Sequence, residues 1–313
     1  MTTSATTRPT GHHHPVAGIA LMLTGIFFFA LNDAMGKFLV ATFSVGQILL
    51  VRSIAAMVVL APFIQREGWA PFRAMPRPWL QLLRAVFATM EVACFYWALT
   101  DMSLADVMTF YLAGPIYVTA VSPFLLGEKV GWRRWAAVFA GFVGVMIALN
   151  PTAGAFTPAA FVAIAGSFSF SIFMVCTRLV RGSSGIVLVT IQNVSALVFG
   201  AIVAPFAWVS LSWFDGALLT LLGVVAMIAY LCINKALELA EASVVVPYQY
   251  STIFWAIILG YIFFGDIPTV PMLAGAGIII AAGIYIFIRE QQVAKVAARD
   301  AAKEPAFAEP PPG

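Results

Sequence analysis

Charged residues are scarce in this sequence. They make up 10% of its 313 residues, whereas soluble proteins carry about 25%. Apolar residues make up 62%, and the mean hydropathy is +0.96. Too few polar residues remain to cover the surface of a soluble fold of this size, so lipid must be the solvent for most of the chain. A soluble globular fold is thereby excluded.

Cysteine and histidine are also rare. The three cysteines, Cys94, Cys176 and Cys232, each lie in an apolar run, which indicates small buried side chains and no disulfide framework. The three histidines stand together at positions 12–14, which excludes a histidine base or an H-E-x-x-H metal site inside the membrane. We therefore expect no metal and no other cofactor.

Long apolar runs fill most of the chain. A membrane-spanning helix needs about 20 mostly apolar residues. Cutting the sequence at charges, prolines and glycines gives ten candidates, at residues 17–38, 44–64, 79–100, 104–125, 134–150, 158–179, 186–208, 215–235, 243–264 and 270–288. We predict an all-α membrane protein of ten transmembrane helices, with disordered tails at residues 1–15 and 290–313.

Basic residues are distributed unevenly between the two sides of the membrane. Lys and Arg are retained on the cytoplasmic side. With the N-terminus inside, the inner segments hold 14 of the 17 basic residues: Arg8, Arg66, Arg73, Arg77, Lys129, Arg133, Arg134, Arg178, Arg181, Lys235, Arg289, Lys295, Arg299 and Lys303. We predict that both termini are cytoplasmic and that the protein lies in a bacterial-type inner membrane.

The two halves of the chain share landmarks. Ala98-Leu99 precedes Gly127-Glu128 at the same spacing that separates Ala236-Leu237 from Gly265-Asp266. Five candidate spans fall in residues 16–150 and five more in 151–289. An odd number of spans in each half requires the second half to insert upside down, so we predict two inverted five-helix repeats.

Several motifs suggest a family. The segment Ala98-Leu99-Thr100-Asp101-Met102-Ser103-Leu104-Ala105-Asp106, the Gly127-Glu128-Lys129 turn and the glycines of the fifth span, Gly141 and Gly144, resemble the EamA-domain carriers of the drug/metabolite transporter superfamily. The chain is also similar to members that carry S-adenosylmethionine or riboflavin. In this family each half ends in a Gly-Glu turn followed by a glycine-containing helix, and here Asp266 replaces the second glutamate.

Five ionisable residues fall in or at the edge of the predicted spans: Asp33, Arg52, Arg84, Glu91 and Asp106. Such groups are costly in a bilayer unless a partner or water solvates them. Asp33 either lines a transport cavity or pairs with Arg52, and Arg52 either forms that ion pair or contacts a substrate anion. We expect Glu91 to be functional, Arg84 to be an interfacial anchor and Asp106 to be an N-terminal helix cap or a first-turn partner of the helix dipole.

Aromatic and amide side chains form a second group of candidates. The resemblance implies a cavity lined by the first, third, fourth, sixth, eighth and ninth spans, which favours Tyr111 and Gln249 beside Asp33 and Glu91. Asn32 and Trp255 complete the candidate substrate-binding set with Arg52. Tyrosines and tryptophans near span ends are ordinarily interface anchors, and this alternative is preferred for a further three residues, Tyr96, Trp97 and Tyr230.

Two further features concern polar and proline residues inside spans. Pro115 and Pro247 fall in the fourth and ninth spans, the matching elements of the two halves, and bent or broken helices there point to a central site. The serine series Ser167, Ser169 and Ser171 in the sixth span indicates close helix packing, because alternate residues do not share one helical face.

These residues predict a secondary carrier that moves a small organic metabolite by alternating access. The aromatic candidates favour an aromatic or heteroaromatic solute, such as a flavin, an amino acid or a nucleoside-like cation, and the carboxylates favour the cation. Asp33 or Glu91 could also couple a proton. No G-x-x-x-x-G-K-[ST] loop is present, so any driving force is a gradient. The predicted partners are thus a small-molecule substrate, a possible coupling proton and membrane lipid, with no nucleic acid.

Three other functions are alternatives to a metabolite carrier. The first is a multidrug or toxic-metabolite exporter of the same fold. The second is a channel, disfavoured by the inverted repeats and the lack of a filter motif. The third is a membrane-embedded enzyme, disfavoured because the spans contain no histidine and no G-x-S-x-G nucleophile turn.

Overall fold

The structure is a bundle of helices. The computed structural model describes residues 15–125, 131–149, 157–180, 183–239 and 246–301, and these contain helices and no strands. The helices are α1 (Pro15–Val40), α2 (Val45–Glu67), α3 (Ala70–Arg73), α4 (Pro78–Ala98), α5 (Leu104–Leu112), α6 (Gly114–Leu125), α7 (Trp132–Leu149), α8 (Pro158–Leu179), α9 (Gly185–Val203), η1 (Ala204–Ala207), α10 (Trp213–Leu239), η2 (Val246–Ser251), α12 (Thr252–Phe264) and α13 (Val270–Ala301).

Seven segments of the described chain are long and apolar enough to cross a membrane. They lie at Val16–Val40, Val45–Glu67, Leu104–Val121, Pro158–Thr177, Gly185–Ala207, Trp213–Ala236 and Val270–Arg289, and two shorter apolar helices occupy Trp135–Ala148 and Tyr248–Phe264. Helix α4, expected as the third span, is not among them, since Gln81, Arg84 and Glu91 lower its hydropathy. The protein is therefore an all-helical integral membrane protein.

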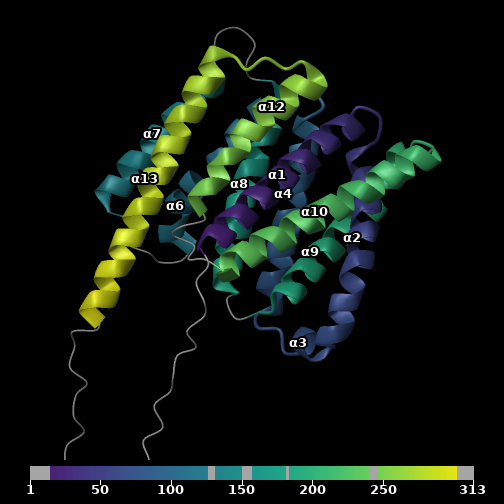
Figure 1. Cartoon of the computed structure of the whole chain (residues 1–313), viewed down its shortest axis with the longest axis horizontal. Helices are drawn as coiled ribbons and strands as arrows, with labels where there is room; N and C mark the ends of the chain where they lie inside the picture. The colour runs from purple at the N-terminus through teal and green to yellow at the C-terminus, as the bar shows by residue number, and fades with distance from the viewer. Residues whose placement is uncertain (1–14, 126–130, 150–156, 181–182, 240–245, 302–313) are drawn as a thin grey trace, which may run out of the picture.

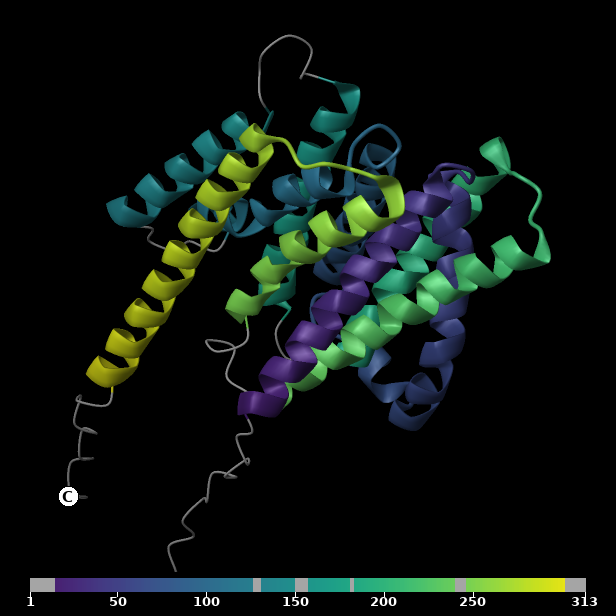
Figure 2. The same cartoon turned by 45° about the horizontal axis from the view of Figure 1, so that its top comes forward.

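Four helix pairs dominate the packing: α1 with α10, α2 with α9, α4 with α8, and α7 with α13. Figure 1 shows α1 beside α10, and Figure 2 shows α13, in yellow, running beside α7 at one edge of the bundle. At the α7–α13 crossing, a Cβ atom added to Gly275 would lie 2.5 Å from the carbonyl oxygen of Gly144. Glycine is therefore required for this close approach.

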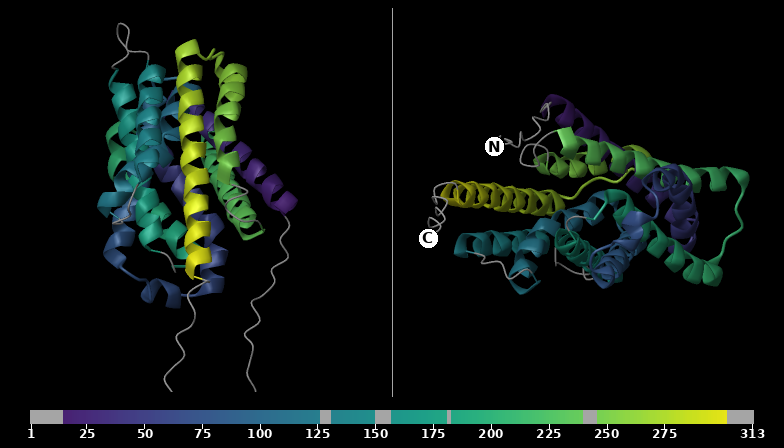
Figure 3. Two further views of the ribbon diagram at one scale, coloured as in Figure 1. Left: turned by 90° about the vertical axis from the view of Figure 1, so that its left-hand side faces the viewer. Right: turned by 90° about the horizontal axis from the view of Figure 1, so that it is seen from below.

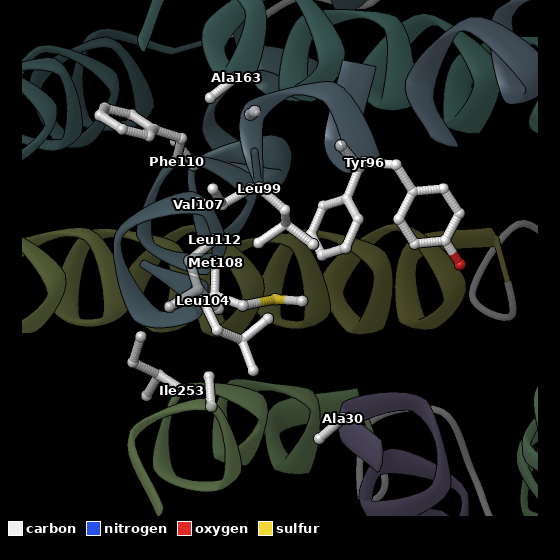
Figure 4. Packing of buried hydrophobic residues seen from close by; sticks show 14 of the residues in the cluster. Ala30, Tyr96, Leu99, Leu104, Val107, Met108, Phe110, Leu112, Ala163 and Ile253 are labelled. Atoms are coloured by element: carbon white, nitrogen blue, oxygen red, sulfur yellow. The ribbon is translucent and has the colours of Figure 1, made fainter. Parts of the chain in front are cut away.

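The hydrophobic core is centred on α5. Figure 4 shows how its apolar side chains meet those of neighbouring helices, with Leu104, Val107 and Met108 from α5, Leu99 after α4, Ala163 from α8 and Ile253 from α12. Ser103 caps the start of α5: its hydroxyl accepts the Asp106 backbone N–H (3.1 Å) and donates to the Asp106 carboxylate (2.6 Å). Ser103 is therefore the capping residue, and Asp106 lies in the first turn of α5, the second of the two roles predicted for it.

Two predicted spans are interrupted. The span expected at 104–125 divides at Ala113 into α5 and α6, with Pro115 in the first turn of α6. In the span expected at 243–264, residues 246–251 form the 3₁₀-helix η2, which contains Pro247, before α12 begins. Proline has no backbone N–H, so Pro115 cannot donate to the carbonyl of Tyr111 four residues earlier, which explains the first interruption.

The C-terminal boundary of the last helix needs a correction. A disordered tail was expected from residue 290, but α13 continues to Ala301. Residues 290–301 are rich in alanine, glutamine, lysine and arginine, which favour helix even without an apolar environment. The Gly127-Glu128-Lys129 turn, residues 1–14 and residues 302–313 lie outside the described residues.

Serine hydroxyls of α8 support the break between α5 and α6. Ser167 donates to the carbonyl oxygen of Phe110 (2.7 Å), and Ser171 donates to that of Gly114 (3.1 Å). Ser169 instead bonds Ala165 within its own helix. The close packing predicted from the serine series is confirmed for the two serines that lie four residues apart, since i and i+4 share a helical face.

An ion pair joins the end of α1 to the turn after α12. The Lys37 ammonium lies 2.5 Å from the Asp266 carboxylate and 4.6 Å from the centre of the Phe264 ring. Gly265 adopts the left-handed conformation (φ +67°) that ends α12 and presents Asp266 to Lys37. This contact closes the bundle at the end where α1 finishes.

We predict that Ser167→Ala lowers the free energy of unfolding by about 0.5–1.5 kcal/mol, because it removes a buried interhelical hydrogen bond. Ser169→Ala is the matched control, since it removes a hydroxyl that bonds only its own helix. Thermal unfolding of the purified protein in detergent measures both. Equal effects of the two substitutions would contradict the support that we assign to Ser167.

We predict that Lys37→Met, which keeps the aliphatic stem, destabilises the protein by about 1–2 kcal/mol because Asp266 loses its partner in a partly buried position. Asp266→Asn should cost a similar amount. The double variant should be no less stable than either single variant, because both remove the same contact. Strict additivity of the two effects in thermal unfolding would show that the ion pair contributes nothing.

Candidate functional site

Three charged side chains from three helices gather inside the bundle. Asp33 comes from α1, Arg52 from α2 and Glu91 from α4, and each is half-buried. Helices α1, α2 and α4 contact one another, so the three side chains lie in one region of the bundle, where both carboxyl groups interact electrostatically with Arg52 and with each other. The structure thus brings together three of the residues that the sequence analysis selected.

Arg52 is held by Tyr96. Its guanidinium donates to the Tyr96 hydroxyl (2.6 Å) and lies 5.6 Å from the centre of that ring. Among the described residues, no carboxylate lies within 4 Å of Arg52, so the direct pair with Asp33 that we considered is not formed. The guanidinium keeps donors available for another acceptor.

The environment of Tyr96 differs from the one expected from the sequence. It was expected to be an interface anchor, but it is only 1% exposed. Its ring edge packs directly against Gly36 of α1, where any side chain would collide with it. The neighbouring Trp97 is 61% exposed, as expected for a residue that faces lipid. Adjacent residues on one helix therefore have opposite environments, which hydropathy cannot distinguish.

Tyr111 links α5 to the charged cluster. Its hydroxyl donates to the backbone carbonyl of Glu91 (2.9 Å), and its ring meets that of Phe95 edge to face at 5.1 Å. Gly166 of α8 leaves the space that the hydroxyl occupies. Tyr111 thus positions the segment of α4 that carries Glu91.

The environment of Arg84 also differs from the one expected from the sequence. It was expected to be an interfacial anchor, but it is 4% exposed. It donates to the Thr177 hydroxyl (2.8 Å), to the Leu188 carbonyl (3.1 Å) and to the Gln192 side-chain oxygen (3.4 Å). Its guanidinium also lies 4.8 Å from the centre of the Phe173 ring. Neutral acceptors on α8 and α9 therefore solvate this buried charge, and no carboxylate of the described residues lies within 4 Å of it.

Gln192 extends this network towards α10. Its amide nitrogen lies 3.4 Å from the Tyr230 hydroxyl, to which it donates, and the Tyr230 ring packs against Phe29 of α1 at 5.3 Å. Tyr230, like Tyr96, was expected to be an interface anchor, and it is instead half-buried. Arg84 thus lies in a polar network that includes helices from both halves of the chain.

The remaining candidates lie apart from the charged cluster. The buried amide of Asn32 donates to the Leu222 carbonyl (2.7 Å) and so fastens α1 to α10. Trp255 packs edge to face on Phe27 at 4.9 Å, nearer the start of α1. Gln249 lies in η2 and is exposed. The structure therefore places Asn32 and Trp255 at two other interfaces of α1 and leaves Gln249 exposed in η2.

A small pocket opens beside Arg52, between α2, α4 and α9. Its lining is Leu49, Arg52, Ser53, Ala88, Thr89, Val92, Gln192, Asn193 and Ala196, and its volume of about 20 Å³ accommodates one water-sized group. Sequence reasoning did not select Ser53 or Thr89. The signal that could have found Ser53 is its place beside Arg52 within an apolar span.

The cluster can bind charged groups. Its two carboxyl groups can bind a cation, and an arginine with available donors can bind an anion. Within the described part of the chain, no group of three or more His, Cys, Asp or Glu residues is placed to hold a metal ion.

Comparisons with known proteins agree with this architecture. The chain is 26% identical over 282 residues to the S-adenosylmethionine uptake transporter of Rickettsia bellii, and 27% identical over 283 residues to the riboflavin transporter of Vibrio cholerae. Each alignment covers 88% of this chain and 94% of the relative. The pseudopaline exporter of Pseudomonas aeruginosa is 22% identical over 287 residues, covering 86% and 95%.

A solved structure and a family model also match this chain. One crystal structure shares the fold with a TM-score of 0.61 at 14% identity, covering 89% of this chain and 99% of that one. The EamA-like transporter family matches twice, over residues 16–150 and residues 157–289. The chain therefore belongs to the EamA-like transporter family, and it is a membrane transporter rather than an enzyme.

Proposed function

We propose that the protein is a secondary carrier that moves a small, positively charged or zwitterionic organic solute with an aromatic or heteroaromatic ring across a bacterial-type inner membrane. The observation that carries this proposal is that Asp33, Arg52 and Glu91, on three helices that contact one another, are half-buried and have no ion-pair partner within 4 Å among the described residues. Charged groups at this depth need a compensating partner or water, and a charged solute supplies one.

Ten transmembrane helices in two inverted repeats are part of the proposal. The first family match contains α1, α2, α4, α5–α6 and α7, and the second contains α8, α9, α10, η2–α12 and α13. A shift of five spans converts the α1–α10 pair into the α8–α4 pair, and it maps α2–α9 and α7–α13 onto themselves. The four dominant contacts are these pairs, which supports the repeat.

Orientation follows from the arrangement of the ends. Helix α1 begins, α13 ends and α3 lies towards the same end of the bundle (Figures 1 and 3). Arg66, Arg73 and Arg77 flank or lie in α3, so the positive-inside rule favours this end as cytoplasmic. Both termini are then cytoplasmic, and the Lys37–Asp266 pair lies towards the outer face.

Alternating access fits the position of the site between the two halves. Arg84 and Thr89 of the first half bond residues of α8 and α9 in the second, so relative motion of the halves would alter the surroundings of the site. Asp33 or Glu91 could in addition carry a coupling proton. The relatives named for S-adenosylmethionine uptake and riboflavin transport suggest nucleoside-like or flavin solutes, and the charged cluster favours the former.

A second candidate is an exporter of toxic metabolites or drugs. It is favoured by the likeness to the pseudopaline exporter. The same site serves both directions of transport, because net flux in a secondary carrier follows the gradients. Efflux from loaded cells separates the two candidates.

Counterflow in proteoliposomes tests the proposal. Vesicles loaded with one solute at a time, from S-adenosylmethionine, riboflavin, aromatic amino acids and other amino acids, receive a trace of the same labelled solute outside. We expect saturable accumulation of the tracer for a cationic or zwitterionic member of this panel. The proposal fails if correctly folded protein exchanges none of them.

Neutralising the carboxylates should impair this exchange. We predict that Asp33→Asn and Glu91→Gln each lower the initial rate at least about tenfold, because a lost charge-assisted contact is worth about 1.5–3 kcal/mol. Asp101→Asn, which changes an exposed carboxylate, is the matched control. Unchanged rates and an unchanged pH profile in both variants, at equal protein levels, would exclude the carboxylates from solute binding and from proton coupling.

A further inference from the structure

The pocket between α2, α4 and α9 contains a buried hydroxyl without a partner. Ser53 is 1% exposed, and its hydroxyl oxygen makes no hydrogen bond to any described residue. Buried polar groups are almost always bonded, so an unbonded one calls for an unseen partner. Because Ser53 lines the pocket, the missing partner belongs inside it.

Positive charge flanks the same pocket. Arg52 lines it directly, and Arg84 reaches it through the side chain of Gln192, which also lines it. The described residues offer neither guanidinium a carboxylate within 4 Å. A pocket with a free hydroxyl donor and two incompletely neutralised arginines selects for an anionic oxygen.

Outside this pocket, Asp33 and Glu91 favour a cationic group. They interact electrostatically with Arg52 and do not line the pocket. A solute that satisfies both environments carries a cationic group near the two carboxylates and an anionic group at Arg52 and Ser53. An α-amino acid group has this arrangement of an ammonium beside a carboxylate.

We infer that the pocket lined by Arg52, Ser53 and Gln192 receives the carboxylate of the transported solute, and that the solute is an amino-acid-type zwitterion. This inference rests on the proposed carrier function. The pocket volume of about 20 Å³ admits one carboxylate oxygen, so the rest of the solute lies outside the pocket. Arg52 and the Ser53 hydroxyl donate to the carboxylate, while Arg84 holds the Gln192 side chain in place.

Paired competitors test the inference. S-adenosylmethionine is compared with its decarboxylated form, and phenylalanine with phenethylamine, as inhibitors of the counterflow of whichever panel solute exchanges. Within each pair only the carboxylate differs. We expect the carboxylate-bearing member to inhibit at a concentration about ten to a hundred times lower, the effect of one charge-assisted contact.

Two variants assign that preference to this pocket. Ser53→Ala removes the donor and should reduce the preference for the carboxylate severalfold. Gln192→Glu places a fixed carboxylate beside both arginines, so it should abolish the preference and leave binding of the amine. Ser169→Ala, which removes a buried hydroxyl bonded within its own helix, should leave the preference unchanged.

The outcomes separate this inference from the function on which it rests. Exchange of riboflavin alone, or equal inhibition by both members of each pair, would overturn the inference and leave the carrier function standing. A preference that survives in both Ser53→Ala and Gln192→Glu would show that the pocket holds only water. If no solute exchanges in vesicles that contain folded protein, the carrier function fails and the inference with it.

Discussion

Charge in a low-dielectric interior must be solvated by the protein, by water or by a ligand. The arginines inside this bundle meet that requirement in two different ways. Arg84 is solvated by neutral acceptors and an aromatic ring on α8 and α9. Arg52 donates a hydrogen bond to one tyrosine hydroxyl. Asp33 and Glu91 interact with it electrostatically without forming an ion pair. The first arrangement surrounds a guanidinium with neutral acceptors, whereas the second leaves Arg52, Asp33 and Glu91 without an ion-pair partner within 4 Å among the described residues.

The pairing of helices across the two family matches puts this charge at a shared interface. Asp33, Arg52 and Glu91 come from the first match, as do Tyr96 and Tyr111, which bond Arg52 and the Glu91 backbone, whereas Gln192 and Asn193 of α9, which line the pocket beside Arg52, come from the second. Neither half completes the site alone. Contacts such as Asn32 to the Leu222 carbonyl and Lys37 to Asp266 fix the halves against each other at other points along α1.

Sequence reasoning found the charged residues of the site but not their partners. Apolar runs located the helices because the hydropathy of a span can be read from consecutive residues. The contact between Ser103 and Asp106 could also be predicted, because the two residues lie three positions apart. Whether Arg84 and Tyr96 face lipid or protein depends on which helices pack against α4, and no local pattern encodes that pairing. Pro115 indicated the division of the 104–125 segment, whereas the support of this break by Ser167 and Ser171 depends on a distant helix that no local pattern identifies.

The central claim is that the space beside Arg52 and Glu91 is a water-accessible solute site. A single cysteine introduced as Val92→Cys, with Cys94, Cys176 and Cys232 replaced by alanine, reports on it directly, because Val92 lines the pocket. Val86→Cys, on the exposed surface of the same helix, is the reference. We predict that a charged, membrane-impermeant thiol reagent labels the cysteine at position 92, that labelling slows several-fold with a saturating exchanged solute, and that position 86 shows no such protection. Labelling at position 92 that is absent, or that the solute leaves unchanged, would contradict the account.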